Sequence, residues 1–420
     1  MRLTLLLLLP LSVGPVHRTA GAQTAPASSL TPAALDSAPV SIRWNRLVPV
    51  FAQEAAASRR AARIAAAGDS AALRRIAQTP PPILFRVYTL LSVAQYGALN
   101  AANDERGLST EAAIASASAA VLREQFTDSA VRASIARELT RDLDRIRKGT
   151  RAAERASAGK RLGEDVARRV IAWAPPLNFA EVWNGTIPTG PGMWYSARGV
   201  PPMGTNLASS RGWLLDSAAR FRPAPPPTYG SPEFRAALEE VQRVARARAP
   251  EQTVIAQRWN IADPWAPWNE TAVAALLRHR ASDSAAVRVL AVLNVASSDA
   301  IIACFEAKYH YWTIRPSQAD TTLALADSVS LPNFPSYPSG HACSAGAFDA
   351  VLGHFVPQDR ASFTRIAEEQ AMSRLYGGIH YRFDNDVGLA VGRAVARYAI
   401  ERERRGGLNV WRSAGVAPTP

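Results

Sequence analysis

The chain has 420 residues, 48% of them hydrophobic and 20% charged, so it can bury the core of one large domain or two ordinary ones. This composition excludes a mainly disordered protein, a collagen-like repeat and a small disulfide-rich scaffold. The formal net charge is +13, but the basic residues lie among acidic ones on predicted helices, without the aromatic-interleaved basic runs typical of nucleic-acid binding. We therefore expect no nucleic-acid partner.

The N-terminus has the pattern of a secretory signal peptide. Arg2 precedes a leucine-rich run over 3–13, and Ala20-Gly21-Ala22 supplies small residues before a cleavage site. The run is shorter than the roughly 20 residues that span a bilayer. We assign 1–22 as signal peptide and expect an exported protein, periplasmic or secreted, whose mature form does not span a membrane.

The rest of the chain is predicted to be all-α. Residues 23–40 are rich in Ala, Pro, Ser and Thr and indicate a flexible leader. Residues 41–410 are predicted to form one domain, followed by a tail over 411–420. Apolar residues recur at helical spacing, and the expected helices are 44–66, 69–78, 81–103, 109–124, 127–148, 158–173, 231–248, 250–259, 268–281, 283–311, 341–355, 358–372 and 386–404.

A long stretch over 175–232 interrupts the helical pattern. It is rich in proline and glycine and contains Trp183, Trp194 and Trp213, which argue against disorder. Loops of this length in compact domains are usually functional or cover a core. The sequence leaves open whether this segment covers the core or shapes a substrate entrance.

Three short blocks in the last third concentrate residues suited to binding an oxyanion. They span 308–316, 338–341 and 373–384, and they supply Lys308, Arg315, Ser339, Gly340 and Arg374. Guanidinium groups grip two oxygens each, and an ammonium acts as a point charge. Glycine lets the backbone approach a ligand, and a helix that starts near His341 favours an anion at its N-terminus. Lysine is rare here, since only Lys148, Lys160 and Lys308 are lysines among 48 basic residues.

The same blocks contain two histidines that could perform a transfer reaction. One imidazole could attack or ligate the central atom, and the other could move a proton. Asp384 follows His380 by four residues, so on a helical turn the carboxylate could hold that imidazole in one tautomer. His17, His279, His310 and His354 lie outside the blocks, and nothing in the sequence assigns them a role.

Together the blocks read Lys-x6-Arg-Pro, Pro-Ser-Gly-His and Ser-Arg-x5-His-x3-Asp. In order and spacing this resembles the signature of the superfamily that contains type-2 phosphatidic acid phosphatases (PAP2) and vanadium-dependent haloperoxidases. The long helical N-terminal half, together with the stretches 304–309, 334–338 and 376–384, resembles the bacterial secreted haloperoxidase-like branch.

The resemblance implies a helical bundle with an oxyanion at its end and a role for each motif residue. Vanadate or phosphate oxygens would be bound by Lys308, Arg315, Ser339, Gly340 and Arg374. His341 would be the acid–base, His380 the vanadium ligand or the phosphorus nucleophile, and Asp384 the residue that orients His380. Vanadate would be the cofactor of a peroxidase that uses hydrogen peroxide and a halide. A phosphatase would need none, and no haem is implied.

The flanking residues give two further expectations. Phe334 resembles the aromatic of fungal chloroperoxidases, whereas Phe305 stands where those enzymes have tryptophan, so the resemblance leaves the halide open and places both rings beside the halide or substrate. Cys304 and Cys343 are the two cysteines, which excludes a multi-cysteine metal site. They flank the site, and export makes a disulfide between them a candidate.

Three functions follow from these observations. The first is an exported vanadium-dependent haloperoxidase-like enzyme. The second is a secreted acid phosphatase that acts on phosphate esters through a phosphohistidine at the same residues. The third is a non-catalytic oxyanion-binding protein, against which the two histidines argue, because anion capture needs neither an acid nor a nucleophile.

Overall fold

The computed structural model describes residues 38–78, 82–148, 150–176, 183–196, 200–261 and 264–412. The predicted signal peptide, most of the predicted leader and most of the tail lie outside these residues. The described part is helical, which confirms the predicted class, and its only β feature is an isolated bridge between Met193 and Thr313. The α-helices are α2 (Val40–Ala65), α3 (Ser70–Gln78), α4 (Leu84–Asp104), α5 (Thr110–Gln125), α6 (Ser129–Ile146), α7 (Thr150–Trp173), α8 (Pro232–Arg246), α9 (Pro250–Arg258), α10 (Trp265–Arg278), α11 (Asp283–Tyr311), α12 (Pro316–Ala319), α13 (Gly340–Phe355), α14 (Arg360–Tyr376) and α15 (Arg382–Arg404).

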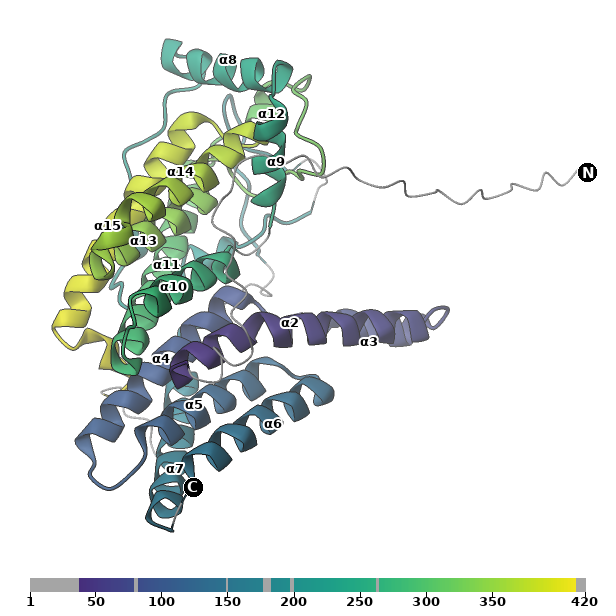
Figure 1. Cartoon of the computed structure of the whole chain (residues 1–420). Helices are drawn as coiled ribbons and strands as arrows, with labels where there is room; N and C mark the ends of the chain where they lie inside the picture. The colour runs from purple at the N-terminus through teal and green to yellow at the C-terminus, as the bar shows by residue number, and fades with distance from the viewer. Residues whose placement is uncertain are drawn as a thin grey trace, which may run out of the picture.

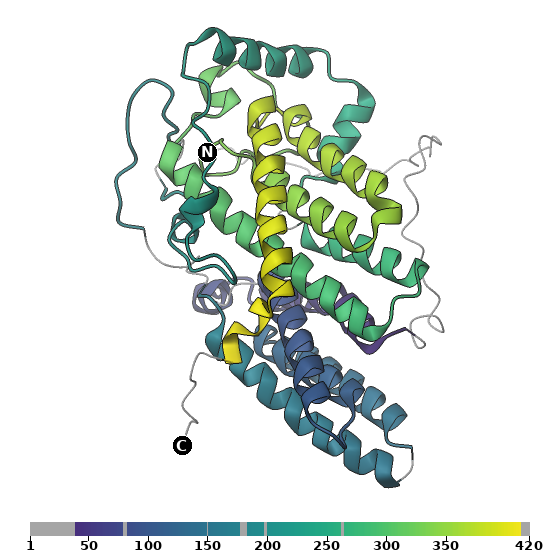
Figure 2. The same ribbon diagram turned by 90° about the vertical axis from the view of Figure 1, so that its left-hand side faces the viewer.

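The helices form two groups that meet along α4 and α11. Helices α4 to α7 form one group, and α11, α13, α14 and α15 form the other, with α8, α9 and α12 at its far end (Figure 1). The second view shows α15 running along α13 and α14 through the length of the second group (Figure 2). Among the described helices, only α11 has the length and apolar composition of a membrane span, and its apolar window is almost entirely buried, as in a core helix.

Small residues bring α13 and α15 into backbone contact. A Cβ added at Gly346 of α13 would lie 2.3 Å from the carbonyl oxygen of Leu389, and one added at Gly392 of α15 would lie 2.0 Å from that of Cys343. Neither position has room for a side chain. The close approach fixes the start of α13 beside the start of α15, where Ser339 N donates to Asp384 O at 2.9 Å.

Several helix boundaries differ from the prediction. The helix expected from 158 begins at Thr150 and continues through Gly159 and Gly163. A Cβ added at these glycines would lie 2.2 Å from the Ser109 carbonyl oxygen at the N-cap of α5 and 2.1 Å from the Ala113 carbonyl oxygen in α5, so both glycines mark a close helix contact. The helices expected over 358–372 and 386–404 extend to Tyr376 and begin at Arg382. Residues 40–65 form one helix, so the last residue predicted as leader is helical.

The proline-rich stretch over 175–232 both covers the core and lines a cavity. Its described part contains only two short 3-10 turns, Thr205–Leu207 and Ala218–Phe221. The buried carboxylate of Asp299 on α11 accepts hydrogen bonds from Trp213 N at 2.7 Å and Leu214 N at 2.9 Å, which fixes the stretch to the core. Burial raises the pKa of Asp299 to about 7, against the effect of these backbone donors.

Candidate active site

Three buried cations lie near the imidazole of His380. Lys308 lies in the last turn of α11, Arg315 immediately precedes α12, and Arg374 lies near the end of α14; their side chains are at most 2% exposed. Lys308 Nζ donates to the carbonyls of Pro335 and Ser336, both at 2.8 Å. Burial lowers the pKa of Lys308 to about 8 and that of each arginine to about 10.

The guanidinium groups are held by backbone carbonyls, which leaves some of their donors free. Arg315 donates through Nε to Phe334 O at 3.0 Å and through one terminal nitrogen to Ile379 O at 2.7 Å, and Arg374 donates to Trp259 O at 2.8 Å. The second terminal nitrogen of Arg315 and Nε of Arg374 are buried without a hydrogen-bond partner. Buried donors of this kind are costly unless a ligand satisfies them. The residues present therefore fit a bound oxyanion.

The imidazole of His380 has one defined tautomer. His380 Nδ1 lies 2.8 Å from Asp384 Oδ2, so it carries the proton that this carboxylate accepts. His380 Nε2 lies 3.1 Å from a terminal nitrogen of Arg315, which can only donate. Burial, with the charges of Arg315 and Lys308 nearby, holds the pKa of His380 well below its ordinary value. The ring is therefore neutral and its Nε2 lone pair faces the cations.

Ser336 is a site residue that the sequence analysis missed. Its hydroxyl donates to Asp384 Oδ2 at 2.5 Å and lies 3.5 Å from His380 Nδ1, while its carbonyl accepts from Lys308. Asp384 Oδ2 also accepts from Tyr381 N at 3.1 Å. Burial raises the pKa of Asp384 to about 6, and the Ser336 hydrogen bond opposes that rise. The only sequence signal was the position of Ser336 two residues before the Pro-Ser-Gly-His block.

The N-terminus of α13 brings Ser339, Gly340 and His341 to the same place. Ser339 caps the helix by accepting from Ala342 N, and a Cβ at Gly340 would meet nothing within 4 Å, so space lies in front of this backbone. His341 Nε2 lies 3.2 Å from the Ile261 carbonyl, so this nitrogen carries a proton and Nδ1 is an acceptor. Burial and the charge of Arg374 hold the pKa of His341 well below its ordinary value.

A cavity of about 940 Å³ opens onto His341 and Arg374. Its other lining residues are Trp194, Tyr195, Val200, Pro201, Met203, Asn260, Ile261, Gln318, Ser330, Leu331, Pro332, Asn333 and Phe334. Of the two predicted pocket aromatics, Phe334 lines the cavity and stands over Lys308 Nζ and the Arg315 guanidinium, at 5.0 and 5.1 Å. Phe305 lies behind it at a centroid distance of 5.3 Å, enclosed by Gly204, and does not line the cavity.

The two cysteines are adjacent but not joined. Cys304 and Cys343 are buried free thiols that shift each other's pKa, and the sulfur of Cys304 lies 3.6 Å from Pro338 O. The candidate disulfide is therefore absent from this structure, although α11 and α13 do bring the two sulfurs together.

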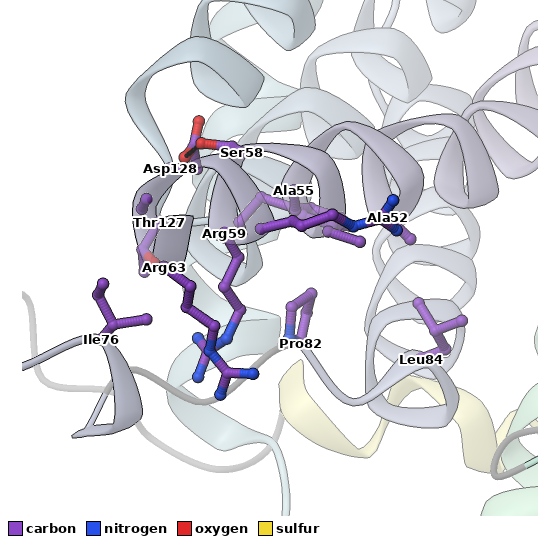
Figure 3. A pocket seen from close by; sticks show the side chains of 14 residues that line it. Ala52, Ala55, Ser58, Arg59, Arg63, Ile76, Pro82, Leu84, Thr127 and Asp128 are labelled. Atoms are coloured by element: carbon purple, nitrogen blue, oxygen red, sulfur yellow. Dashed lines mark hydrogen bonds between the residues drawn. The ribbon is translucent and has the colours of Figure 1, made fainter. Parts of the chain in front are cut away.

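Another cavity, of about 1040 Å³, lies between α2, α3 and the start of α6 (Figure 3). The side chains of Arg59 and Arg63 extend into it, and Ser58 Oγ donates to Asp128 Oδ2 at 2.5 Å on one side. None of the predicted site residues lines this cavity.

Solved structures with a similar fold include vanadium-dependent haloperoxidases. A bacterial vanadium-dependent iodoperoxidase matches with a TM-score of 0.65 at 24% identity, over 77% of this chain and 91% of its own. An apo-type bacterial vanadium-dependent chloroperoxidase matches with a TM-score of 0.62 at 13% identity, over 77% and 94%. At these identities the likeness establishes the fold, a helical bundle.

Sequence comparison identifies a known domain in the part of the chain that carries the motifs. Residues 287–405 match the PAP2 superfamily model, and the chain therefore contains a PAP2 superfamily domain, as its motifs predicted. Lipid A 1-phosphatases of Rhizobium etli and Rhizobium johnstonii are 41% identical over 59 residues, which are 14% of this chain and 25% and 24% of theirs. A vanadium-dependent bromoperoxidase of Ascophyllum nodosum is 30% identical over 101 residues, 17% of this chain and 18% of its own. The matches thus span a quarter or less of these curated relatives.

Proposed function

We propose that this protein is an exported vanadium-dependent haloperoxidase-like enzyme. The observation that carries the proposal is the neutral His380, whose Nε2 lone pair is held among three buried cations with two unpaired guanidinium donors. A tetrahedral oxyanion would satisfy those donors and give this lone pair a central atom to bind. The fold shared with haloperoxidases supports the same activity.

Each residue of the three motif blocks that was predicted to belong to the site has a role in this proposal. Lys308, Arg315 and Arg374 would bind vanadate oxygens, together with Ser339 and the Gly340 backbone. His380 Nε2 would ligate vanadium, and Asp384 would keep the ring in the required tautomer. Bound vanadate would supply a Lewis acid that activates hydrogen peroxide toward a halide without a change in metal oxidation state. His341 would move protons at the solvent side of the anion, since a bound anion offsets the Arg374 charge that now lowers its pKa.

The lipid A 1-phosphatase matches favour a second candidate, a secreted phosphatase acting on phosphate esters. Here the phosphate ester would occupy the cation cluster. His380 Nε2 would bond to phosphorus as the bond to the ester oxygen breaks, and that oxygen would take a proton from His341. Water would then attack the phosphohistidine, return a proton to His341 and release phosphate. The three cations would stabilise the charge on the equatorial oxygens in either reaction.

A paired assay of the purified protein separates the two functions. One arm contains orthovanadate, hydrogen peroxide, bromide and a small halogen acceptor, and the other contains a phosphate ester without vanadate. Vanadate-dependent bromination that disappears in His380→Ala supports the peroxidase. Phosphate release that vanadate inhibits, without bromination, supports the phosphatase. Full activity of His380→Ala in either arm would refute the assigned mechanism, and anion binding without turnover would support the non-catalytic alternative.

A further inference from the structure

The cavity in front of the cation cluster is much larger than an oxyanion requires. Its volume of about 940 Å³ lies at the upper end of the roughly 300–1,000 Å³ typical of pockets for organic ligands. Among the described residues that line it, Arg374 and His341 are the only positively charged or basic groups, and none is acidic. The cavity therefore has a cationic inner end and otherwise neutral walls.

Aromatic rings and prolines form much of those walls. Trp194, Tyr195 and Phe334 line the cavity with Pro201 and Pro332. Such flat side chains are suited to stacking against a planar group. Tyr195 is 46% exposed and Met203 is 58% exposed, so apolar surface faces solvent at the outer end of the cavity.

A second hollow of about 610 Å³ continues this surface outward. It shares Trp194, Tyr195, Val200 and Pro201 with the first cavity and adds Trp183. The ring of Trp312 packs against two of these tryptophans, with centroid distances of 5.7 Å to Trp183 and 6.1 Å to Trp194.

The backbone of Trp312 holds this aromatic wall in place. Trp312 has a φ of 49°, a left-handed conformation that is rare for a large residue, and its carbonyl accepts from Trp194 N at 2.6 Å. The chain thus fixes an aromatic surface directly beside the end of the block that carries Lys308 and Arg315. Anion binding alone does not require such a surface.

We propose that this groove is the binding site for a planar aromatic organic substrate, which stacks on Tyr195 and packs against Phe334 with its reacting edge toward Arg374 and His341. The proposal rests on the proposed function and names its substrate class. In a peroxidase the ring would be the halogen acceptor: a ring carbon bonds to the halogen of hypohalous acid, the ring loses a proton, and the oxygen leaves as water. In a phosphatase the ring would be the leaving group of an aryl phosphate.

Calorimetric titration with 2-naphthol, in the absence of vanadate and phosphate, tests the groove itself. We expect saturable binding that is about tenfold weaker in Tyr195→Ser, the loss expected for one aromatic contact of about 1.4 kcal/mol. Met203→Ser should also weaken binding. Tyr229→Ser is the matched control, because Tyr229 is 45% exposed but lines neither hollow, and its affinity should equal that of the wild type.

Two results would overturn the proposal. One is an absence of saturable 2-naphthol binding, or equal affinity in wild type and Tyr195→Ser. The other is octanol binding as tightly as 2-naphthol with the same dependence on Tyr195, which would identify an alkyl-chain site instead. The titration contains no vanadate or phosphate, so it tests ring binding alone. If the paired assay found neither bromination nor phosphate release, the proposed enzyme activity would be refuted, but the result of the titration would still stand. His380→Ala should retain 2-naphthol binding, because His380 does not line the groove.

Discussion

Ser336 connects the charged groups of the site that lie farthest apart in the sequence. Its carbonyl holds Lys308, and its hydroxyl holds the Asp384 oxygen that orients His380. A single serine therefore couples the lysine of the first motif block to the histidine of the third. We assign it as a positioning residue, since it acts through Asp384.

Replacing Ser336 with alanine should impair turnover and shift its pH dependence. The lost hydrogen bond corresponds to about 1 kcal/mol, or roughly a fivefold fall in kcat/KM. Without it, the pKa of Asp384 rises above its present value of about 6. Because Asp384 accepts the His380 proton only when ionised, activity should be lost at higher pH on acidification than in the wild type. The pH–rate profile measures this shift.

Ser297→Ala is a suitable control for this variant. Ser297 is also buried, but its hydroxyl donates to Leu293 O within its own helix. The pH–rate profile of Ser297→Ala should therefore match that of the wild type. A Ser336→Ala profile that coincides with the wild type would mean that Asp384 orients His380 without help from Ser336.

The lowered pKa of the buried Lys308 ammonium leads to a second prediction, which concerns how anion affinity depends on pH. Sulfate keeps its double charge from pH 6 to 9.5, so it reports only on the protein. The pKa of Lys308 is about 8 in the empty site, whereas both arginines stay charged to about 10. Sulfate affinity should therefore be constant below pH 7 and fall above pH 8, by up to about tenfold per pH unit.

Calorimetric titration of sulfate across this range measures the effect. Lys308→Met should bind sulfate more weakly at pH 6.5 and show no decline between pH 7 and 9. A decline of the same size in Lys308→Met would assign the titration to another group. In the wild type, flat affinity through pH 9.5 would contradict the lowered pKa of Lys308.

At the scale of elements, local patterns predicted the helices, but contacts determined where several of them begin and end. The helix over 283–311 was predicted with its observed bounds, because Ser282 caps it and its apolar run is continuous. The helix predicted over 158–173 begins earlier, at Thr150, and no local pattern shows that its Gly159 and Gly163 face a neighbouring helix. The path of 175–232 depends on Asp299, more than eighty residues after Trp213 and Leu214, and no local signal shows that contact.

The contact between α13 and α15 predicts a large stability difference between two glycines of one helix. Alanine at Gly346 would push a Cβ against the Leu389 carbonyl, whereas alanine at Gly353 would meet only the flexible Arg360 side chain, at 3.3 Å. Overpacking costs about 1–3 kcal/mol, and a helical Gly→Ala exchange otherwise stabilises by up to about 1 kcal/mol. Urea unfolding should show Gly346→Ala destabilised and Gly353→Ala equal to wild type or more stable. Equal stability of the two variants would contradict the close approach of α13 and α15.

At the scale of the whole molecule, the PAP2 superfamily domain over 287–405 is joined to the earlier helices by buried polar contacts. Asn269 of α10 accepts from Asn45 of α2 and donates to Asn294 of α11, both at 2.9 Å. Asn294 in turn donates to Ser92 of α4 at 2.9 Å. Four helices therefore meet in one hydrogen-bonded chain, which the sequence could not reveal because its members are spread over more than 200 residues.

Removing Asn269 from this hydrogen-bond network tests whether the molecule unfolds as one domain. Asn269→Leu leaves Asn45 and Asn294 without their partner in a buried setting, at a cost of about 1–3 kcal/mol for each group. The Tm should therefore fall substantially, and because both helix groups share the network, unfolding should remain a single transition. Ser116→Ala is the control, since Ser116 Oγ is buried without a hydrogen-bond partner and its removal should leave the Tm unchanged or higher. If calorimetry resolves two unfolding transitions in the wild type, the chain forms two domains and the single-domain prediction is wrong. A single transition that moves to lower temperature in Asn269→Leu would support one domain.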